Sequence, residues 1–242
     1  MRVRRWGGVL ATAAVAAWLL SGCELPDFGV PRGATSQSRA TFHLWQGSVI
    51  AALCVGAVVW GLIFYVLIRF RRRSDEVPSQ KRYNIPWEVA YTAIPVVIVA
   101  VLFGFTVSAQ NRVDHLSATP AVSIQVTAYQ WGWRFQYTDS GVTVATQGQQ
   151  PPTLVLPVGQ TVRIVLVSAD VVHAFYVPGF LFKRDAVPGF TNRFDLNVQK
   201  GGTYLGRCTV FCGLRHDVML FNVEALPPPD FNSWLASQRA SS

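Results

Sequence analysis

Thr161-Val-Arg-Ile-Val-Leu-Val167 places an apolar side chain at every second position, which is the pattern of a strand with one buried face. The same period of two recurs at residues 122–128, 194–198 and 220–224. Clusters rich in Gly and Pro separate these segments, at 139–141, 150–152, 157–159, 188–189 and 200–202. Short strands with turns between them are typical of an antiparallel sandwich or barrel, so we predict an all-β domain over residues 121–226. Three prolines then open a tail at 227–242, where residues 230–239 favour a short helix.

Two uncharged apolar runs precede this domain, Val49–Ile68 with twenty residues and Val89–Val107 with nineteen. At about 1.5 Å per residue, each can cross the roughly 30 Å hydrocarbon core of a bilayer. We therefore predict a two-helix transmembrane hairpin, with spans at 48–70 and 87–109, a loop at 71–86 and a linker at 110–120. The alternative is a pair of buried helices in a soluble protein.

The ends of this hairpin differ in charge. Basic residues gather at the end of the first run and in the short loop that follows it: Arg69, Arg71, Arg72, Arg73, Lys81 and Arg82. Basic loops stay on the cytoplasmic side of a membrane, so the β domain is expected outside. The formal net charge of +8 therefore indicates membrane topology, and we expect no nucleic-acid partner.

The first 22 residues have the pattern of a secretory signal peptide, with a basic head, an apolar run and small residues at the end. They lead into Leu20-Ser-Gly-Cys23, which resembles a bacterial lipobox. We expect Cys23 to be lipidated and residues 23–47 to form a lipid-anchored segment outside the membrane. The alternatives are an ordinary signal peptide with a chance cysteine, or an uncleaved helix.

A dense group of metal-binding side chains follows the β pattern, in Cys208-Thr-Val-Phe-Cys212-Gly-Leu-Arg-His216-Asp-Val-Met219. One thiolate, an imidazole and a weak thioether are the donors of a mononuclear copper site. A second thiolate allows two metal ions to be bridged, and each then needs an imidazole. His173 offers the second imidazole, because it follows the strand at 161–167 by six residues and so lies near one end of the sheet.

Other interpretations of these residues remain open at this stage. A structural zinc ion could use two cysteines and two histidines, and Cys208 could form a disulfide with Cys212 in an oxidising compartment. We expect the remaining histidines, His43 and His115, to be structural or solvated. Cys54, inside the first apolar run, is expected to act as a small hydrophobic residue.

From about Trp45 to Trp234 the chain resembles subunit II of the haem-copper cytochrome c oxidases. The segments that carry this resemblance are the hairpin, Gln130–Tyr137, Ser168–His173, Asp185–Gly189 and the loop 208–219. The resemblance implies a cupredoxin-like β-barrel or sandwich after the hairpin. The lipobox and Phe182–Asp185 are most similar to versions from actinobacteria.

The resemblance also implies a dinuclear copper (CuA) cofactor. Its protein ligands would be His173, Cys208, the backbone carbonyl of Val210, Cys212, His216 and Met219. The family usually has Glu at position 210, where the carboxylate helps to bind magnesium. Val210 has no such group, so this position would not contribute a carboxylate to a magnesium site.

Further roles implied by the resemblance are electron entry at Trp131 and the mouth of a proton pathway at Glu88. No residue of this chain would be catalytic, since oxygen is reduced in subunit I. The implied partners are subunits I and III, membrane lipid and a cytochrome c donor, in a bacterial plasma membrane. Basic residues only slightly outnumber acidic ones after Gln110, so we expect a membrane-bound donor more than a soluble basic one.

Three other functions share parts of this pattern. A quinol oxidase subunit lacks the copper ligands that are present here. A CuA-containing subunit of a nitric oxide reductase is an alternative that Val210 leaves open. A membrane copper chaperone is a second alternative, from the class of binding proteins. No Cys-x-x-Cys-His occurs, so no c-type haem is fused to the chain.

Overall fold

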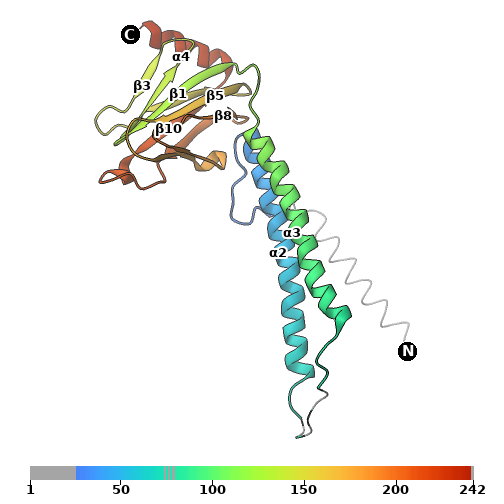
Figure 1. Ribbon diagram of the computed structural model, residues 1–242. Coiled ribbons are helices and arrows are strands. Elements are labelled where there is room, and N and C mark those ends of the chain that lie inside the picture. The colour runs from blue at the N-terminus through green and yellow to red at the C-terminus, as the bar shows by residue number, and fades with distance from the viewer. Residues whose placement is uncertain (1–25, 74, 76, 78–79, 241–242) are drawn as a thin grey trace, which may run out of the picture. The chain divides into compact units, whose positions relative to one another are not determined.

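The computed structural model describes residues 26–73, 75, 77 and 80–240 (Figure 1). The predicted signal peptide and Cys23 lie outside these residues. Element labels begin at α2, as in Figure 1.

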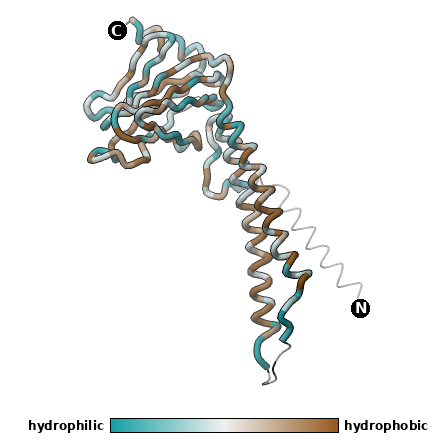
Figure 2. The backbone as a smooth tube through the Cα atoms, viewed as in Figure 1, coloured by the Kyte–Doolittle hydropathy of each residue, from teal (hydrophilic) through white to brown (hydrophobic). Residues whose placement is uncertain are grey.

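Two long helices confirm the predicted hairpin, and both are long and apolar enough to cross a membrane. They are α2 (Ser36–Arg69) and α3 (Ile85–Asp114). Figure 2 shows hydrophobic residues along most of both helices. Helix α2 begins well before the predicted span because Thr35 and Ser38 form a capping box, in which each side chain bonds the other residue's backbone N–H. Pro95 lies inside α3, as membrane helices tolerate.

The structure between residues 122 and 226 confirms the all-β prediction for this domain. The strands are β1 (Val122–Tyr129), β2 (Gly132–Tyr137), β3 (Thr143–Ala145), β4 (Thr153–Pro157), β5 (Thr161–Ser168), β6 (His173–Val177), β7 (Phe182–Ala186), β8 (Asn192–Asn197), β9 (Gly202–Arg207) and β10 (Leu220–Leu226). They form two five-stranded sheets, in the orders β3-β2-β1-β5-β8 and β4-β10-β9-β6-β7. Short 3-10 helices occur at η1 (Pro178–Phe180) and η2 (His216–Val218).

Strand pairing differs from the purely antiparallel expectation at two places. Strands β1 and β5 are parallel, with Val126 opposite Leu166, and so are β10 and β4. Parallel neighbours need a long crossover connection. The chain provides one by building β2, β3 and β4 between β1 and β5.

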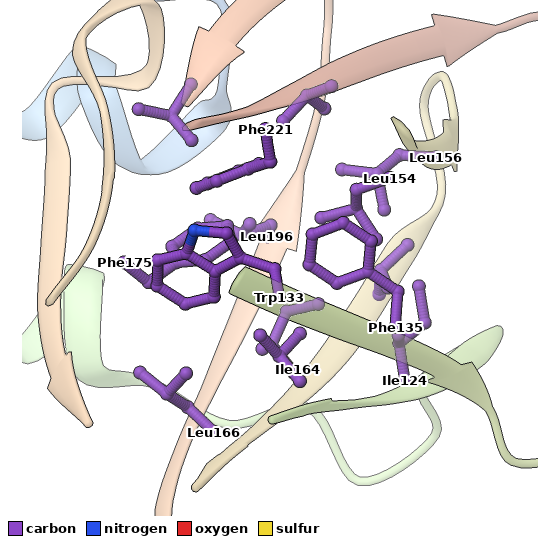
Figure 3. Close-up of a cluster of buried hydrophobic side chains, with 14 of the residues drawn as sticks. Ile124, Trp133, Phe135, Leu154, Leu156, Ile164, Leu166, Phe175, Leu196 and Phe221 are labelled. Carbon is purple, nitrogen blue, oxygen red and sulfur yellow. The ribbon is translucent and has the colours of Figure 1, made fainter. Parts of the chain in front are cut away.

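The hydrophobic core lies between the two sheets (Figure 3). Trp133 from one sheet packs edge-on against Phe175 and Phe221 from the other, with centroid distances of 6.1 and 5.0 Å. The inward residues of β5 are Val162, Ile164 and Leu166, all fully buried, which accounts for the alternation in the sequence. This packed core gives the loops at the sheet ends a rigid base.

Contacts also join the β domain to the helical segments. The Ala34 N–H donates to the carbonyl of Gly179 at 2.8 Å, and the Ala34 carbonyl accepts from Gln199 at 2.7 Å. Beyond α3, Arg163 pairs with the buried Asp195 and donates to the Ser117 carbonyl at 2.6 Å. At the other end of the chain, α4 (Pro228–Ala240) forms where a short helix was expected, and Trp234 packs on Tyr137.

Candidate metal centre

Two neighbouring strands bring the candidate ligands together at one end of their sheet. His173 is the first residue of β6, and the loop from Cys208 to Met219 joins β9 to β10. In strand β6, Tyr176 lies opposite Arg207 of β9. Arg207 also lies opposite Leu220, the first residue of β10. The loop therefore leaves and re-enters the sheet beside the start of β6.

The sulfur and nitrogen atoms of these residues converge. The Sγ atoms of Cys208 and Cys212 lie 3.9 Å apart, and Nδ1 of His173 lies 4.0 Å from the first of them. The ligand atoms of these three residues all lie within 4.8 Å of one another. Around Cys212 Sγ, Nδ1 of His216 is at 3.5 Å and Sδ of Met219 is at 3.8 Å. The Val210 carbonyl accepts from the Cys208 thiol at 3.3 Å.

Most of the cluster is shielded from solvent. His173 is fully buried, Cys208, Cys212 and Met219 are almost so, and His216 is half-buried. Cys208 and Cys212 are free thiols, so the structure does not have the disulfide that the sequence left open. His43, within α2, and His115, which caps α3, are not members of the cluster.

The thiols have opposite pKa shifts. Burial disfavours the Cys208 thiolate, but hydrogen bonds from His173 and from backbone groups outweigh this and lower the pKa of Cys208 to about 6. Burial and repulsion from the Cys208 thiolate raise the pKa of Cys212 to about 12. Without a cation the pair therefore carries one negative charge at neutral pH, because a second thiolate 3.9 Å away is repelled. A metal cation beside both sulfurs would offset this repulsion and stabilise the second thiolate.

The donor set fits copper. Thiolate and thioether sulfur are soft ligands, imidazole suits copper, and a weak axial methionine or backbone carbonyl is typical of copper electron-transfer sites. A structural zinc site is closed by four N and S ligands, and would leave the sulfur of Met219 and the carbonyl of Val210 without a purpose. Two thiolates between two imidazoles suit a pair of metal ions, with one imidazole for each.

Two residues beside the cluster were not assigned a role from the sequence. The Asp170 carboxylate accepts a hydrogen bond from Nε2 of His173 at 2.8 Å. Burial would raise its pKa, but this bond and those from the backbone of Gln130 and Val171 lower it. Nε2 of Gln130 donates to the carbonyl of Cys212 at 2.7 Å. The only available signal was that an acid stands three residues before a candidate histidine ligand.

The remaining predicted site residues lie in different parts of the chain. Trp131 is half-buried in the turn between β1 and β2, where its indole N–H donates to the carbonyl of Cys212 at 3.1 Å. Glu88 lies in the first turn of α3, and its Oε1 accepts from the backbone N–H of Asn84 at 2.9 Å. Cys54 is in α2, with an exposed side chain.

Comparison with known proteins agrees with this geometry. The family model described as cytochrome c oxidase subunit II, periplasmic domain, matches residues 122–226, and the model of its transmembrane domain matches residues 25–107. A probable cytochrome c oxidase subunit 2 from Nocardia farcinica is 36% identical, covering 99% of this chain and 82% of the relative. The relative of that name from Streptomyces avermitilis is 39% identical, covering 95% and 83%. Cytochrome c oxidase subunit 2 from Mycobacterium bovis is 33% identical, covering 93% and 80%.

These relatives do not favour the alternatives of a nitric oxide reductase subunit or a copper chaperone. The cofactor is the dinuclear copper centre CuA, for which the cluster at residues 173 and 208–219 has the required donors. The chain is a membrane protein with its copper domain outside, and it is part of a haem-copper oxidase complex, an oxidoreductase. By both of its matched domains, the chain belongs to the cytochrome c oxidase subunit II family.

Proposed function

We propose that two copper ions are held by the side chains of five residues and one backbone carbonyl: His173, Cys208, Cys212, His216, Met219 and the carbonyl of Val210. When bound, the pair supplies a one-electron carrier whose charge is shared between two metals. The observation that carries this proposal is the convergence of His173, Cys208 and Cys212 within 4.8 Å. A strand end and a loop fixed at both ends hold these donors in place, so the chain restricts their movement when the charge changes.

We further propose Trp131 as the point at which electrons enter. Its ring is half-buried, and its N–H bonds the backbone of a proposed ligand, Cys212, at 3.1 Å. An electron that arrives at this ring has a short path of hydrogen-bonded and covalent atoms to the sulfur of that cysteine. The donor would be a cytochrome c, and the acceptor would be haem in subunit I.

Exposed apolar side chains in the same loop support a protein partner. Phe211 and Leu214 are 81% and 88% exposed although they flank Cys212. Large apolar groups in such positions mark interaction sites. We assign this surface to the oxidase complex, with subunit I as the direct partner and subunit III in the same assembly.

The membrane arrangement forms part of the proposal. With a basic loop on the cytoplasmic side, both α2 and α3 span the plasma membrane and the β domain faces outward. A lipid on Cys23 would add a third anchor on the outer side. Val210 contributes a carbonyl and an aliphatic side chain, so this position supplies no carboxylate to a magnesium ion.

Electron paramagnetic resonance of the full chain in detergent, loaded with copper and half-reduced, tests the metal assignment. We expect a mixed-valence signal split by two equivalent copper nuclei, with two copper ions bound per chain. A spectrum from one isolated copper ion, or no uptake of copper, contradicts the proposed ligand set.

Glu88 is proposed to mark the entrance of a proton pathway into subunit I. We expect Glu88→Gln to slow oxygen consumption by the assembled oxidase, because the amide cannot carry a proton. The amide oxygen can still accept the hydrogen bond from Asn84, so the start of α3 should be preserved. Oxygen uptake and copper content are measured on the same preparation.

Asp75→Asn is the matched control for this change. It also removes one acid from the cytoplasmic segment, where Asp75 pairs with Arg72 while highly exposed. Equal oxygen uptake by the two variants would show that the charge of Glu88 has no special role.

A further inference from the structure

The Asp170 carboxylate joins three separate donors near the cluster. Oδ1 accepts from Nε2 of His173 at 2.8 Å and from the backbone N–H of Val171 at 2.6 Å. Oδ2 accepts from the backbone N–H of Gln130, forty positions away in the sequence, at 2.7 Å. One side chain therefore connects the start of β6 to the turn between β1 and β2.

That turn also contacts the loop that carries the proposed copper ligands. The carbonyl of Cys212 accepts from the side chains of both turn residues, from Nε2 of Gln130 at 2.7 Å and from Nε1 of Trp131 at 3.1 Å. Gly213 makes room for this contact, since a Cβ there would lie 3.1 Å from Nε2 of Gln130 and 3.1 Å from the Trp131 ring. Its φ of +117° is also a conformation that favours glycine.

We infer that Asp170 is a positioning residue that fixes the ring orientation of His173 and, through the backbone of Gln130, the place of Trp131 against Cys212. Proposed electron entry and one proposed copper ligand would then depend on a single carboxylate. This inference rests on the proposed ligand set, in which His173 and Cys212 hold the copper pair.

The effect of Asp170 on His173 follows from the two nitrogens of the imidazole. A carboxylate accepts hydrogen bonds, so Nε2 of His173 must carry the proton that it shares with Asp170. In the neutral ring that can bind a metal, the lone pair is then on Nδ1, which is the nitrogen that faces Cys208 at 4.0 Å. Among the described residues, Asp170 is the only hydrogen-bond partner of Nε2 of His173. Without the carboxylate, nothing there selects the tautomer that leaves Nδ1 free for a metal.

The hydrogen bond between Asp170 and His173 also has an electronic effect on the metal. A carboxylate bonded to a ligating imidazole makes that ligand more basic, and loss of such a partner typically weakens metal binding about 10–100-fold. A more basic ligand favours the more oxidised state of the metal pair. Removing the carboxylate is therefore expected to raise the reduction potential of the centre.

Asp170→Asn in the full chain, purified in detergent, tests the inference, because a neutral amide has one acceptor oxygen where the carboxylate accepts on two. Three quantities are compared with wild type: the copper dissociation constant in competition with a chelator, the reduction potential, and the copper hyperfine splitting. We expect copper binding to weaken by about 10–100-fold, the potential to rise and the splitting to change. In the assembled oxidase, electron entry from reduced cytochrome c should also slow.

Asp139→Asn is the matched control, because it removes one carboxylate from the same domain. Oδ2 of Asp139 accepts a backbone hydrogen bond from Ser123 at 3.3 Å, and in the described part of the chain Asp139 forms no hydrogen bond with a cluster residue. This variant should match wild type in every quantity. If Asp170→Asn also matches wild type, Asp170 is an ordinary loop residue and the inference is overturned.

Thermal unfolding of the copper-free proteins separates positioning from folding. Should Asp170→Asn fail to fold, Asp170→Glu restores a carboxylate at that place. Recovery of copper affinity in that variant supports the inference, and continued loss overturns it. If wild type binds no copper pair, the proposed ligand set itself has failed, which is a different result from an intact pair that does not respond to Asp170.

Discussion

Cys212→Ser is expected to abolish the dinuclear copper centre while leaving the fold intact. The sulfur of Cys212 lies near three other proposed ligand atoms, with Cys208 Sγ at 3.9 Å, His216 Nδ1 at 3.5 Å and Met219 Sδ at 3.8 Å. A serine hydroxyl has nearly the same shape, but it is a hard donor and stays protonated, so it cannot bridge two copper ions. The two-copper hyperfine pattern should disappear, and at most one copper ion should remain bound per chain.

Loss of the dinuclear centre should also abolish oxidase activity. In the assembled oxidase, oxygen uptake driven by reduced cytochrome c is expected to drop to background, because the proposed route from Trp131 to haem passes through this centre. Cys54→Ser is the matched control, since Cys54 lies in α2 with an exposed side chain. A Cys212→Ser chain that retains the two-copper signal would show that the cysteine is not a bridging ligand.

The part of the fold that the sequence predicted well is the part governed by local periodicity. The alternation at 161–167 places Val162, Ile164 and Leu166 on one face, and all three are fully buried in β5. The parallel pairing of β1 with β5 was not predicted. Alternation identifies which face of a strand is buried, but it does not say which distant strand lies beside it or in which direction.

The candidate site likewise has one part that local spacing predicts and another that depends on contacts between distant segments. Spacing alone indicated the members of the loop from Cys208 to Met219, because residues four apart in a short loop can turn toward one point. His173 was expected near one end of the sheet, and it is the first residue of β6. The role of Asp170 could not be predicted, because it depends on a turn forty positions earlier that folds back against it. Tertiary contacts between loops leave no periodic pattern in a sequence.

Trp131→Phe is expected to slow electron entry strongly without disturbing the copper centre. Phenylalanine keeps an aromatic ring but removes the N–H that bonds the Cys212 carbonyl at 3.1 Å. The copper loop should stay in place, because Nε2 of Gln130 still donates to the same carbonyl at 2.7 Å. We expect kcat/KM with reduced cytochrome c to fall on the order of a hundredfold, the size associated with a reacting group misplaced by about 1 Å.

Two comparisons separate this effect from a structural one. Trp234→Phe makes the same substitution at a partly buried tryptophan of α4, which packs on Tyr137 and Phe231 and should leave turnover unchanged. The hyperfine splitting of Trp131→Phe should equal that of wild type, whereas Asp170→Asn changes it. If Trp131→Phe changes only KM, the ring contributes to donor binding alone. If it changes neither KM nor kcat, electrons reach the centre through another part of the loop, of which His216 is the half-buried ligand nearest to solvent.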